Sequence, residues 1–138
     1  MAYWLFKTEP ESFSWEMQKQ RGAKGEPWSG VRNFQAASNM KKMKKGERGF
    51  FYHTGEEKQI VGIVEVIGEY RKDPTDETGR FGLVDVKAVA DMPKPVTLAE
   101  AKADPKLKDM ILVKYSRLSV QPVTEAEWKH ICKLGGVK

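Results

Sequence analysis

The sequence predicts an α+β fold in which a small mixed β-barrel is surrounded by about four short helices. Three observations favour this architecture. Short strand-like segments separated by turns dominate the chain, and four residues that can cap a helix lie between them. The 138 residues contain no internal repeat, no low-complexity tract and no linker. We therefore expect a single domain over residues 1–138, with a core large enough to fold alone.

Six strands are expected, at residues 3–7, 49–53, 60–67, 83–90, 110–113 and 118–120. Residues 3–7 are rich in aromatic side chains, and residues 49–53 follow a turn that contains glycine. Residues 60–67 are β-branched and almost continuously apolar, which is typical of a strand buried on both faces. Residues 83–90 place four small apolar side chains on one face by alternation. These segments would form the wall of the barrel.

Four short helices are expected to begin after the capping residues Ser14, Asn33, Thr97 and Thr124. Thr97 with Glu100 and Thr124 with Glu127 form capping boxes, in which the hydroxyl and the carboxylate each satisfy a backbone N–H that the helix leaves unpaired. Pro105 ends the third helix, and a pair of glycines ends the fourth. The polar loop at residues 72–80 is expected to be mobile and to lie at the mouth or edge of the barrel.

The charge balance favours a polyanionic partner. The net charge is +5 and the sequence pI is near 9.3, although a modest excess of basic residues does not by itself establish nucleic-acid binding. The single cysteine, Cys132, fits a reducing compartment, and residues 1–7 lack the features of a signal peptide, so a cytoplasmic protein is expected. The longest apolar stretch, residues 60–67, is too short to span a membrane, so no membrane partner is expected.

The sequence contains no recognisable catalytic motif. His130 and Cys132 are two residues apart on an expected helix and therefore point in different directions. Zinc would need further ligands at metal-type spacing. No glycine-rich phosphate loop and no G-x-S-x-G turn is present. We therefore expect a protein that is not an enzyme and holds neither a metal nor a cofactor.

The segment WSGVRN at 28–33 is the strongest candidate for a binding site. Trp28 supplies a flat ring in a loop, and Gly30 allows the backbone to approach a ligand closely. Arg32 supplies a planar cationic donor fork, and Asn33 offers the donor and acceptor that can read a base edge. Two structural alternatives remain: Trp28 can cover the edge of a core, and Asn33 can serve as a helix cap alone.

Other candidate residues are less specific. Lys7 and Thr8 leave the first strand and can either contact a phosphate or carbonyl or lie at a solvated strand end. His53 can line the same pocket or be an ordinary residue at a strand end. Tyr70 and Phe81 bracket the polar loop and could close a cage around a ring from the other side. A run of four lysines, at positions 41, 42, 44 and 45, can bind phosphates if it flanks the pocket.

The chain resembles the EVE domain, a member of the PUA-like superfamily related to YTH domains. The resemblance spans nearly the whole chain and rests on YWLFKTEP at 3–10, WSGVRNFQA at 28–36, GFFYHTG at 49–55, IVGIVEV at 60–66, VDV at 84–86, PVTL at 95–98 and RLSVQPVTEAEW at 117–128. It implies a PUA-like barrel with a pocket for a modified base. EVE proteins are proposed to recognise modified cytosines in DNA, whereas YTH domains read a methylated adenine in RNA.

Site residues follow from the resemblance by position. Trp28 matches the family tryptophan at the pocket, and Lys7, Thr8, Ser29, Val31, Arg32 and Asn33 match its neighbours. His53, Arg117 and Ser119 lie in family motifs. The chain departs from the pattern at Phe81, where many EVE sequences carry a tryptophan. Phenylalanine is smaller and has no indole N–H, so the grip on a ring or its selectivity should change if this position forms a cage wall.

The resemblance implies a non-catalytic protein that binds DNA carrying a modified cytosine in an aromatic pocket. The residues also leave open a protein that binds modified RNA, a binder of a free modified nucleoside or small planar ligand, and an enzyme acting on modified nucleotides. They do not indicate which modification is recognised, and they do not indicate the oligomeric state.

Overall fold

The computed structural model describes residues 2–115 and 117–137 and contains one six-stranded sheet in the order β2-β5-β4-β3-β1-β6. β1 pairs with β3 in parallel, and all other neighbouring strands are antiparallel. The expected mixed α+β fold is confirmed. The strands are β1 (Tyr3–Thr8), β2 (Glu26–Pro27), β3 (Arg48–His53), β4 (Gln59–Lys72), β5 (Gly82–Thr97) and β6 (Val120–Val123).

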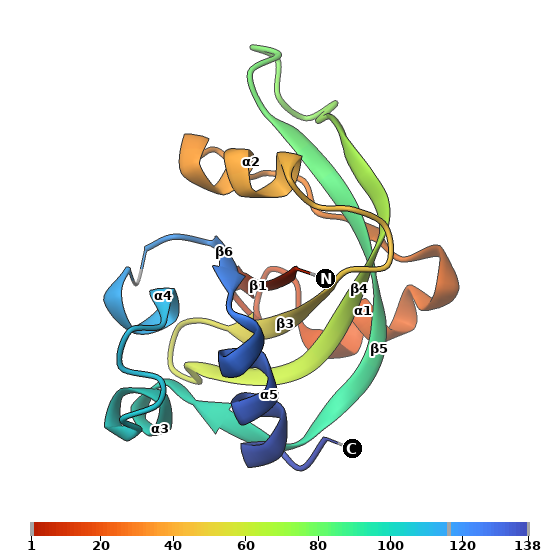
Figure 1. The fold of residues 1–138 in the computed structure, drawn as a ribbon. Helices are drawn as coiled ribbons and strands as arrows, with labels where there is room; N and C mark the ends of the chain where they lie inside the picture. The colour runs from red at the N-terminus through yellow and green to blue at the C-terminus, as the bar shows by residue number, and fades with distance from the viewer. Residues whose placement is uncertain (1, 116, 138) are drawn as a thin grey trace.

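The two central strands are much longer than the sequence pattern indicates. β4 has 14 residues and β5 has 16, and their pairing is interrupted by four shifts of register. Such bulges bend a strand and increase its twist. The sheet is therefore strongly curved, and the β4–β5 hairpin projects from the rest of the molecule (Figure 1).

Both faces of the sheet are covered. Phe6 of β1 and Phe51 of β3 belong to a first core cluster, which also contains Trp15 and Trp28. The intervening side chains, such as Phe50, point the other way into a second cluster. The alternation of successive side chains in a strand explains this division. The central strands are therefore buried on both sides, as the sequence predicts for residues 60–67.

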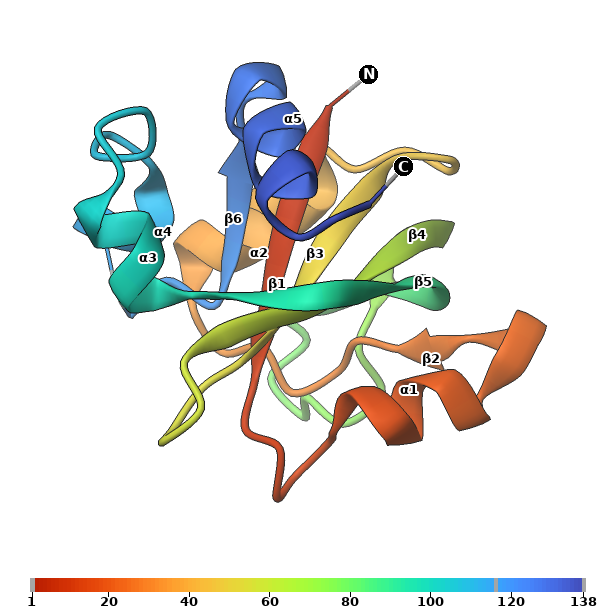
Figure 2. The same ribbon diagram turned by 90° about the horizontal axis from the view of Figure 1, so that it is seen from below.

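Five α-helices pack around the sheet: α1 (Trp15–Gln20), α2 (Phe34–Lys41), α3 (Leu98–Ala103), α4 (Ile111–Lys114) and α5 (Glu125–Leu134), with a 3-10 helix η1 (Gly22–Lys24) after α1. α1 and α2 bury side chains in the first cluster, whereas α3, α4 and α5 gather on the second (Figures 1 and 2). All four expected caps form, and the boxes at Thr97 and Thr124 are complete.

Three expectations about local structure are wrong. Residues 110–113 do not form a strand, because the backbone N–H groups of Val113 and Lys114 both donate to the carbonyl of Met110 and begin a short helix, α4. The last strand begins at Val120 rather than at residue 118. The sequence analysis also missed β2, a two-residue strand that pairs antiparallel with β5. Because α4 forms where a strand was expected, the described residues contain five α-helices rather than about four.

The polar loop between β4 and β5 is extensively hydrogen-bonded. Asp73 and Asp76 are both buried, and each accepts hydrogen bonds from the backbone and hydroxyl of the threonine two residues later. The side chain of Asp76 also accepts from the backbone N–H of Phe81 at 2.7 Å. These turns give the hairpin tip a defined shape at the edge of the sheet. No described helix is both long and apolar enough to cross a lipid bilayer.

Candidate functional site

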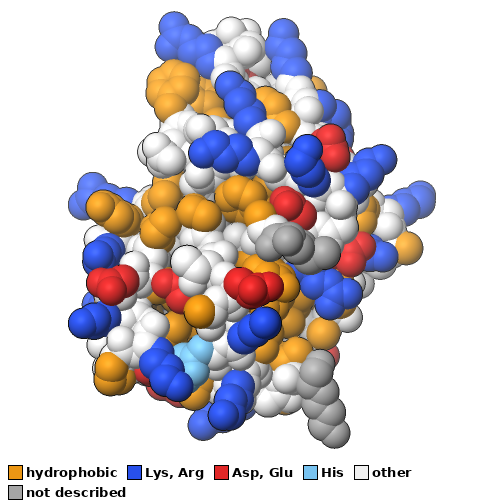
Figure 3. Space-filling view, in the orientation of Figure 1, with side chains coloured by type: hydrophobic (Ala, Val, Ile, Leu, Met, Phe, Trp, Pro, Cys, Tyr) orange, Lys and Arg blue, Asp and Glu red, His pale blue; other side chains and the backbone are white. Residues whose placement is uncertain are grey.

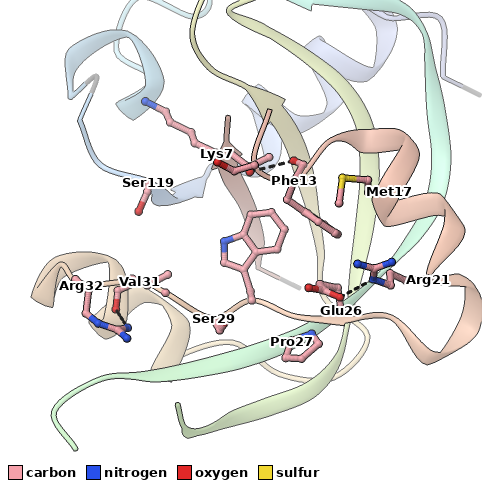
Figure 4. Close-up of a pocket in the computed structure, with 14 residues that line it drawn as sticks. Lys7, Phe13, Met17, Arg21, Glu26, Pro27, Ser29, Val31, Arg32 and Ser119 are labelled. Atoms are coloured by element: carbon pink, nitrogen blue, oxygen red, sulfur yellow. Dashed lines mark hydrogen bonds and ion pairs between the residues drawn. The ribbon is translucent and has the colours of Figure 1, made fainter. Parts of the chain in front are cut away.

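A cavity of about 420 Å³ opens where β1, α1 and the segment after β2 meet, a size typical of ligand sites. Figure 4 shows Lys7 and Ser119 on the opposite side of the cavity from Ser29 and Pro27. Its lining combines aromatic, cationic and hydroxyl side chains: Lys7, Thr8, Ser12, Phe13, Met17, Arg21, Glu26, Pro27, Trp28, Ser29, Gly30, Val31, Arg32 and Ser119.

The structure places some of the candidate site residues in the lining of this cavity and others outside it. It brings seven of them to the cavity: Lys7, Thr8, Trp28, Ser29, Val31, Arg32 and Ser119. It places five outside the lining: Asn33, His53, Tyr70, Phe81 and Arg117. The sequence analysis missed the wall that α1 and the residue before it contribute. Met17 lies in α1 and Arg21 is its C-cap, and their spacing of four residues, which puts side chains on one helix face, is the signal that could have found them. Phe13 precedes the N-cap Ser14 and carries no such signal.

Trp28 forms an aromatic wall whose orientation is fixed by the core. Only 7% of the residue is exposed, and its backbone N–H extends the pairing of β2 by donating to the Val84 carbonyl at 2.8 Å. The indole meets the rings of Phe6, Phe13 and Phe51 edge-on, with centroid distances of 5.3, 6.0 and 5.6 Å. Such edge-to-face contacts favour one ring orientation. The cavity wall is therefore set before any ligand arrives.

The indole N–H of Trp28 differs from those of its neighbours in the same core cluster. Trp4 donates its indole N–H to Glu47 at 3.0 Å, and Trp15 donates to Asp91 at 2.7 Å. Trp28 has no acceptor among the described residues, although it lines the cavity. Its Nε1 is not among the buried side-chain atoms that lack a hydrogen-bond partner, so this N–H is accessible. This donor is therefore available to an acceptor atom on a ligand.

A buried carboxylate of the β4–β5 hairpin holds the loop that follows Trp28. Asp73 is fully buried, and its Oδ2 accepts from the Gly30 backbone N–H at 2.9 Å and from the Arg32 guanidinium at 3.2 Å. The guanidinium also donates to the Thr75 hydroxyl at 3.1 Å. Gly30 has a φ of +81°, a conformation that side chains with a Cβ rarely adopt. The hairpin therefore fixes the loop that lines the cavity.

Asp73 stays ionised throughout the physiological range. Burial alone would raise the pKa of Asp73, but hydrogen bonds from Thr75, Gly30 and Arg32 outweigh it and hold the pKa at about 2. A carboxylate with a lowered pKa stabilises the fold above its unfolded pKa, here 3.8, and loses that contribution as the pH falls toward 2. The contact between hairpin and loop is therefore insensitive to pH near neutrality.

Lys7 contributes to the lining of the cavity, but its amine points away from Trp28 (Figure 4). Its Nζ lies 5.6 Å from the centroid of the Tyr52 ring, and burial lowers the pKa of Lys7 to about 8. At neutral pH the amine is still mostly charged, in a site that disfavours the charge. An anionic ligand group would relieve this penalty, because an opposite charge favours the protonated form.

Replacing Lys7 with methionine is expected to increase the free energy of unfolding at neutral pH by about 1 kcal/mol, a value reduced from the full pKa shift because the side chain is partly solvated. The penalty is complete below the folded pKa of about 8 and fades as the pH rises toward 10.5, the value of an unperturbed lysine. Urea unfolding at several pH values tests this. Equal stabilisation by substitution of the exposed Lys42 would contradict it.

His53 has a structural role rather than a place in the cavity. Its Nε2 accepts from the backbone N–H of Trp15 at 3.0 Å, and its Nδ1 lies 2.8 Å from Glu57. Because Nε2 accepts, Nδ1 carries the proton and donates to the carboxylate. This hydrogen bond lowers the pKa of Glu57. Of the two alternatives that the sequence left open for His53, the structure favours the structural one, since both ring nitrogens are hydrogen-bonded, to the start of α1 and to Glu57.

Asn33 is the N-cap of α2, the structural alternative noted from the sequence. Its Oδ1 accepts from the Ala36 backbone N–H at 2.8 Å. Together with Arg117 it lines a second cavity of about 600 Å³, not the one beside Trp28. The proposed reading of a base edge by Asn33 inside the first cavity is therefore not supported, because the helix start directs the side chain elsewhere.

Tyr70 and Phe81 do not close a cage over Trp28. Phe81 packs instead against Phe34, with ring centroids 4.9 Å apart, and Tyr70 lies beneath Lys41, whose Nζ is 5.6 Å from the ring centroid. The curved hairpin carries both rings to the side of α2. Phe81 is therefore not part of the cavity lining, although Arg32, which lines the cavity, lies over its ring.

The cavity is polar and carries an excess of positive charge. Arg21 is paired with Glu26 at 2.8 Å, and Lys7 and Arg32 add two further cationic side chains to the lining. Among the described residues no three histidine, cysteine, aspartate or glutamate side chains are grouped so as to hold a metal ion. The arrangement can stack a planar ring and bind acceptor atoms or a phosphate.

These features define an EVE domain. The family model described as EVE domain matches residues 2–134, and the chain belongs to this family. Human thymocyte nuclear protein 1 is 32% identical over 165 residues, which cover 96% of this chain and 73% of the human protein.

Solved structures agree with this assignment. Protein Atu2648 from Agrobacterium tumefaciens is 52% identical, with a TM-score of 0.96, over 99% of this chain and 94% of that one. The human THYN1 protein, solved in complex with DNA containing 5-methylcytosine, is 32% identical with a TM-score of 0.92, over 100% and 99%. The YTH domain of Zygosaccharomyces rouxii MRB1, solved with N6-methyladenosine RNA, shares the fold alone, at 19% identity and a TM-score of 0.59 over 99% and 88%.

Proposed function

We propose that this protein binds nucleic acid carrying a modified base, holds that base in the Trp28 cavity and does not alter it chemically. The observation that carries the proposal is the indole of Trp28, which three phenylalanine rings hold edge-on in the wall of a cavity that Lys7, Arg21 and Arg32 also line. The similarity to human THYN1, whose structure contains 5-methylcytosine DNA, makes a modified cytosine in DNA the favoured ligand.

The free-energy cost of taking a base out of a duplex is similar in size to the gain from stacking it on an aromatic side chain. Taking a base out of a duplex costs a few kcal/mol, least when the base is already unpaired. Stacking on an aromatic side chain returns about 1–3 kcal/mol. The cationic side chains around the cavity and the +5 net charge would add an attraction to phosphates that does not depend on sequence. Binding should therefore weaken as the salt concentration rises.

Selection for a methyl group would rest on packing. One extra methyl in a matched apolar gap is worth about 1–3 kcal/mol, or roughly 5- to 150-fold in affinity. The apolar side chains of Phe13, Met17 and Val31 line the cavity and offer such a surface. Hydrogen bonds from the Trp28 indole and the Ser29 hydroxyl would orient the ring.

The proposal is tested by fluorescence-anisotropy titration of short oligonucleotides, single- and double-stranded, DNA and RNA. Each carries cytosine, 5-methylcytosine, 5-hydroxymethylcytosine, adenine or N6-methyladenine at one position. We expect preference for a modified cytosine in DNA, at least about fivefold over cytosine, and recovery of the unchanged oligonucleotide by chromatography. Equal binding to all oligonucleotides would overturn it, and tight binding of a free nucleoside that phosphates do not improve would indicate a small-molecule site.

A further inference from the structure

Phe34, the first residue of α2, is the most exposed large hydrophobic side chain among the described residues, at 66%. Neither core cluster includes it. The Asn33 cap does not require an aromatic residue at the next position, because the cap uses the Asn33 side chain and the Ala36 backbone. Figure 3 shows hydrophobic side chains exposed above α2, with lysine and arginine side chains around them. The exposed ring of Phe34 therefore lies outside both cores.

The ring of Phe34 packs on Phe81 and Arg32, and two buried carboxylates fix the positions of these two residues. Phe34 lies against Phe81 with centroids 4.9 Å apart and ring planes 33° apart. The guanidinium of Arg32 lies 5.9 Å from the centroid of Phe81. Arg32 is held by Asp73, and the Phe81 backbone N–H is held by Asp76. The exposed ring therefore rests on a pre-organised surface, which reduces the entropy that a ligand must overcome.

This surface adjoins the Trp28 cavity. Arg32 both lines the cavity and covers Phe81, so the two sites share a residue. The residues on either side of Phe34, Asn33 and Gln35, line the second cavity together with the cations Lys114 and Arg117. An exposed aromatic ring between cationic side chains matches the pattern of a strand-binding surface, in which bases stack and phosphates meet the charges.

We propose that Phe34 is a second stacking contact, which takes the base next to the one held in the Trp28 cavity. The inference rests on the function proposed above. When one base leaves the stack, its neighbour loses a stacking partner, and an aromatic side chain can replace it. The occupant is therefore a nucleobase of the same strand, and its phosphate lies within the reach of Arg32 or the cations of the second cavity.

The test compares Phe34→Ala with Phe34→Trp, using two ligands. One is 5-methyl-deoxycytidine monophosphate, which fills only the cavity. The other is a short single-stranded DNA with 2-aminopurine beside a 5-methylcytosine. We expect Phe34→Ala to weaken oligonucleotide binding about tenfold, within the range of one base–aromatic stack, and to leave the mononucleotide unaffected. Phe34→Trp should retain the affinity and the quenching of 2-aminopurine fluorescence.

The outcomes separate the two proposals. If the oligonucleotide binds the unaltered protein and Phe34→Ala changes neither affinity nor quenching, the stacking contact is refuted and the function stands. If neither ligand binds the unaltered protein, the proposed function itself fails. Val89→Ala, which removes another exposed apolar side chain further along β5, is the control. An equal loss in that variant would mean a general effect of surface apolarity and would also refute the contact.

Discussion

Replacing Trp28 with alanine is expected to lower the affinity for the preferred modified oligonucleotide by about 10- to 100-fold, because the variant loses the aromatic wall on which the base stacks. The same change removes a nearly buried indole from contact with three phenylalanine rings. It should therefore also lower the free energy of unfolding by about 3–5 kcal/mol. Anisotropy titration and urea unfolding of the same preparations measure the two effects.

The matched variant, Trp28→Phe, keeps an aromatic ring and removes the indole N–H. We expect it to remain folded and to bind about 2- to 10-fold more weakly, the value of one hydrogen bond to the ligand. Comparison of the two variants thereby separates the effect of losing the aromatic ring on binding from the effect of destabilising the fold. Full affinity in a folded Trp28→Ala variant would show that the cavity does not hold the base.

The local elements that the sequence predicts correctly are those specified by short-range chemistry. The capping boxes at Thr97 and Thr124 form as expected, because both partners of each box lie within four residues. Residues 110–113 show the limit of this approach. Four consecutive apolar residues fit a buried strand or a single helical turn equally well, and periodicity cannot distinguish the two over such a length. In the structure the carbonyl of Met110 accepts hydrogen bonds from residues three and four positions later, which is the pattern of a helix.

The length of β4 and β5 was not predictable from apolar content. Glu69 and Arg71 lie in the outer part of β4, where the side chains are exposed and the pattern is polar. Pairing with β5 extends the strand through this region despite its composition, as in the register that joins Arg71 to Leu83. Strand propensity depends on such neighbours, and these neighbours are not visible in one segment of sequence.

The candidate site was predictable only in part, for the same reason. The segment from Trp28 to Arg32 is contiguous, so its unusual mixture of side chains is visible in the sequence. The sequence could not decide between the two roles of His53, because its partner, the backbone N–H of Trp15, is 38 residues away. Asp73 was missed as a positioning residue because its link to Gly30 spans 43 residues. Tertiary packing alone creates these contacts.

Replacing Asp73 with alanine is expected to lower the free energy of unfolding by about 3 kcal/mol, since it leaves the guanidinium of Arg32 and the Gly30 N–H without their buried partner. The loop that lines the cavity should then lose its fixed position, and the affinity for 5-methyl-deoxycytidine monophosphate should fall about tenfold, the cost of ordering the loop on binding. Hydrogen exchange at the Gly30 amide reports the loop directly, and we expect it to accelerate.

Asp76→Ala is the matched control, because the chain places two nearly equivalent carboxylates in one hairpin. Asp76 also accepts from a threonine two residues later and is also buried, but its remaining partner is the Phe81 N–H rather than the cavity loop. This variant should destabilise the hairpin while leaving Gly30 exchange and mononucleotide affinity unchanged. If both variants weaken mononucleotide binding equally, the hairpin acts on the cavity through its overall stability and not through the contact that Asp73 makes.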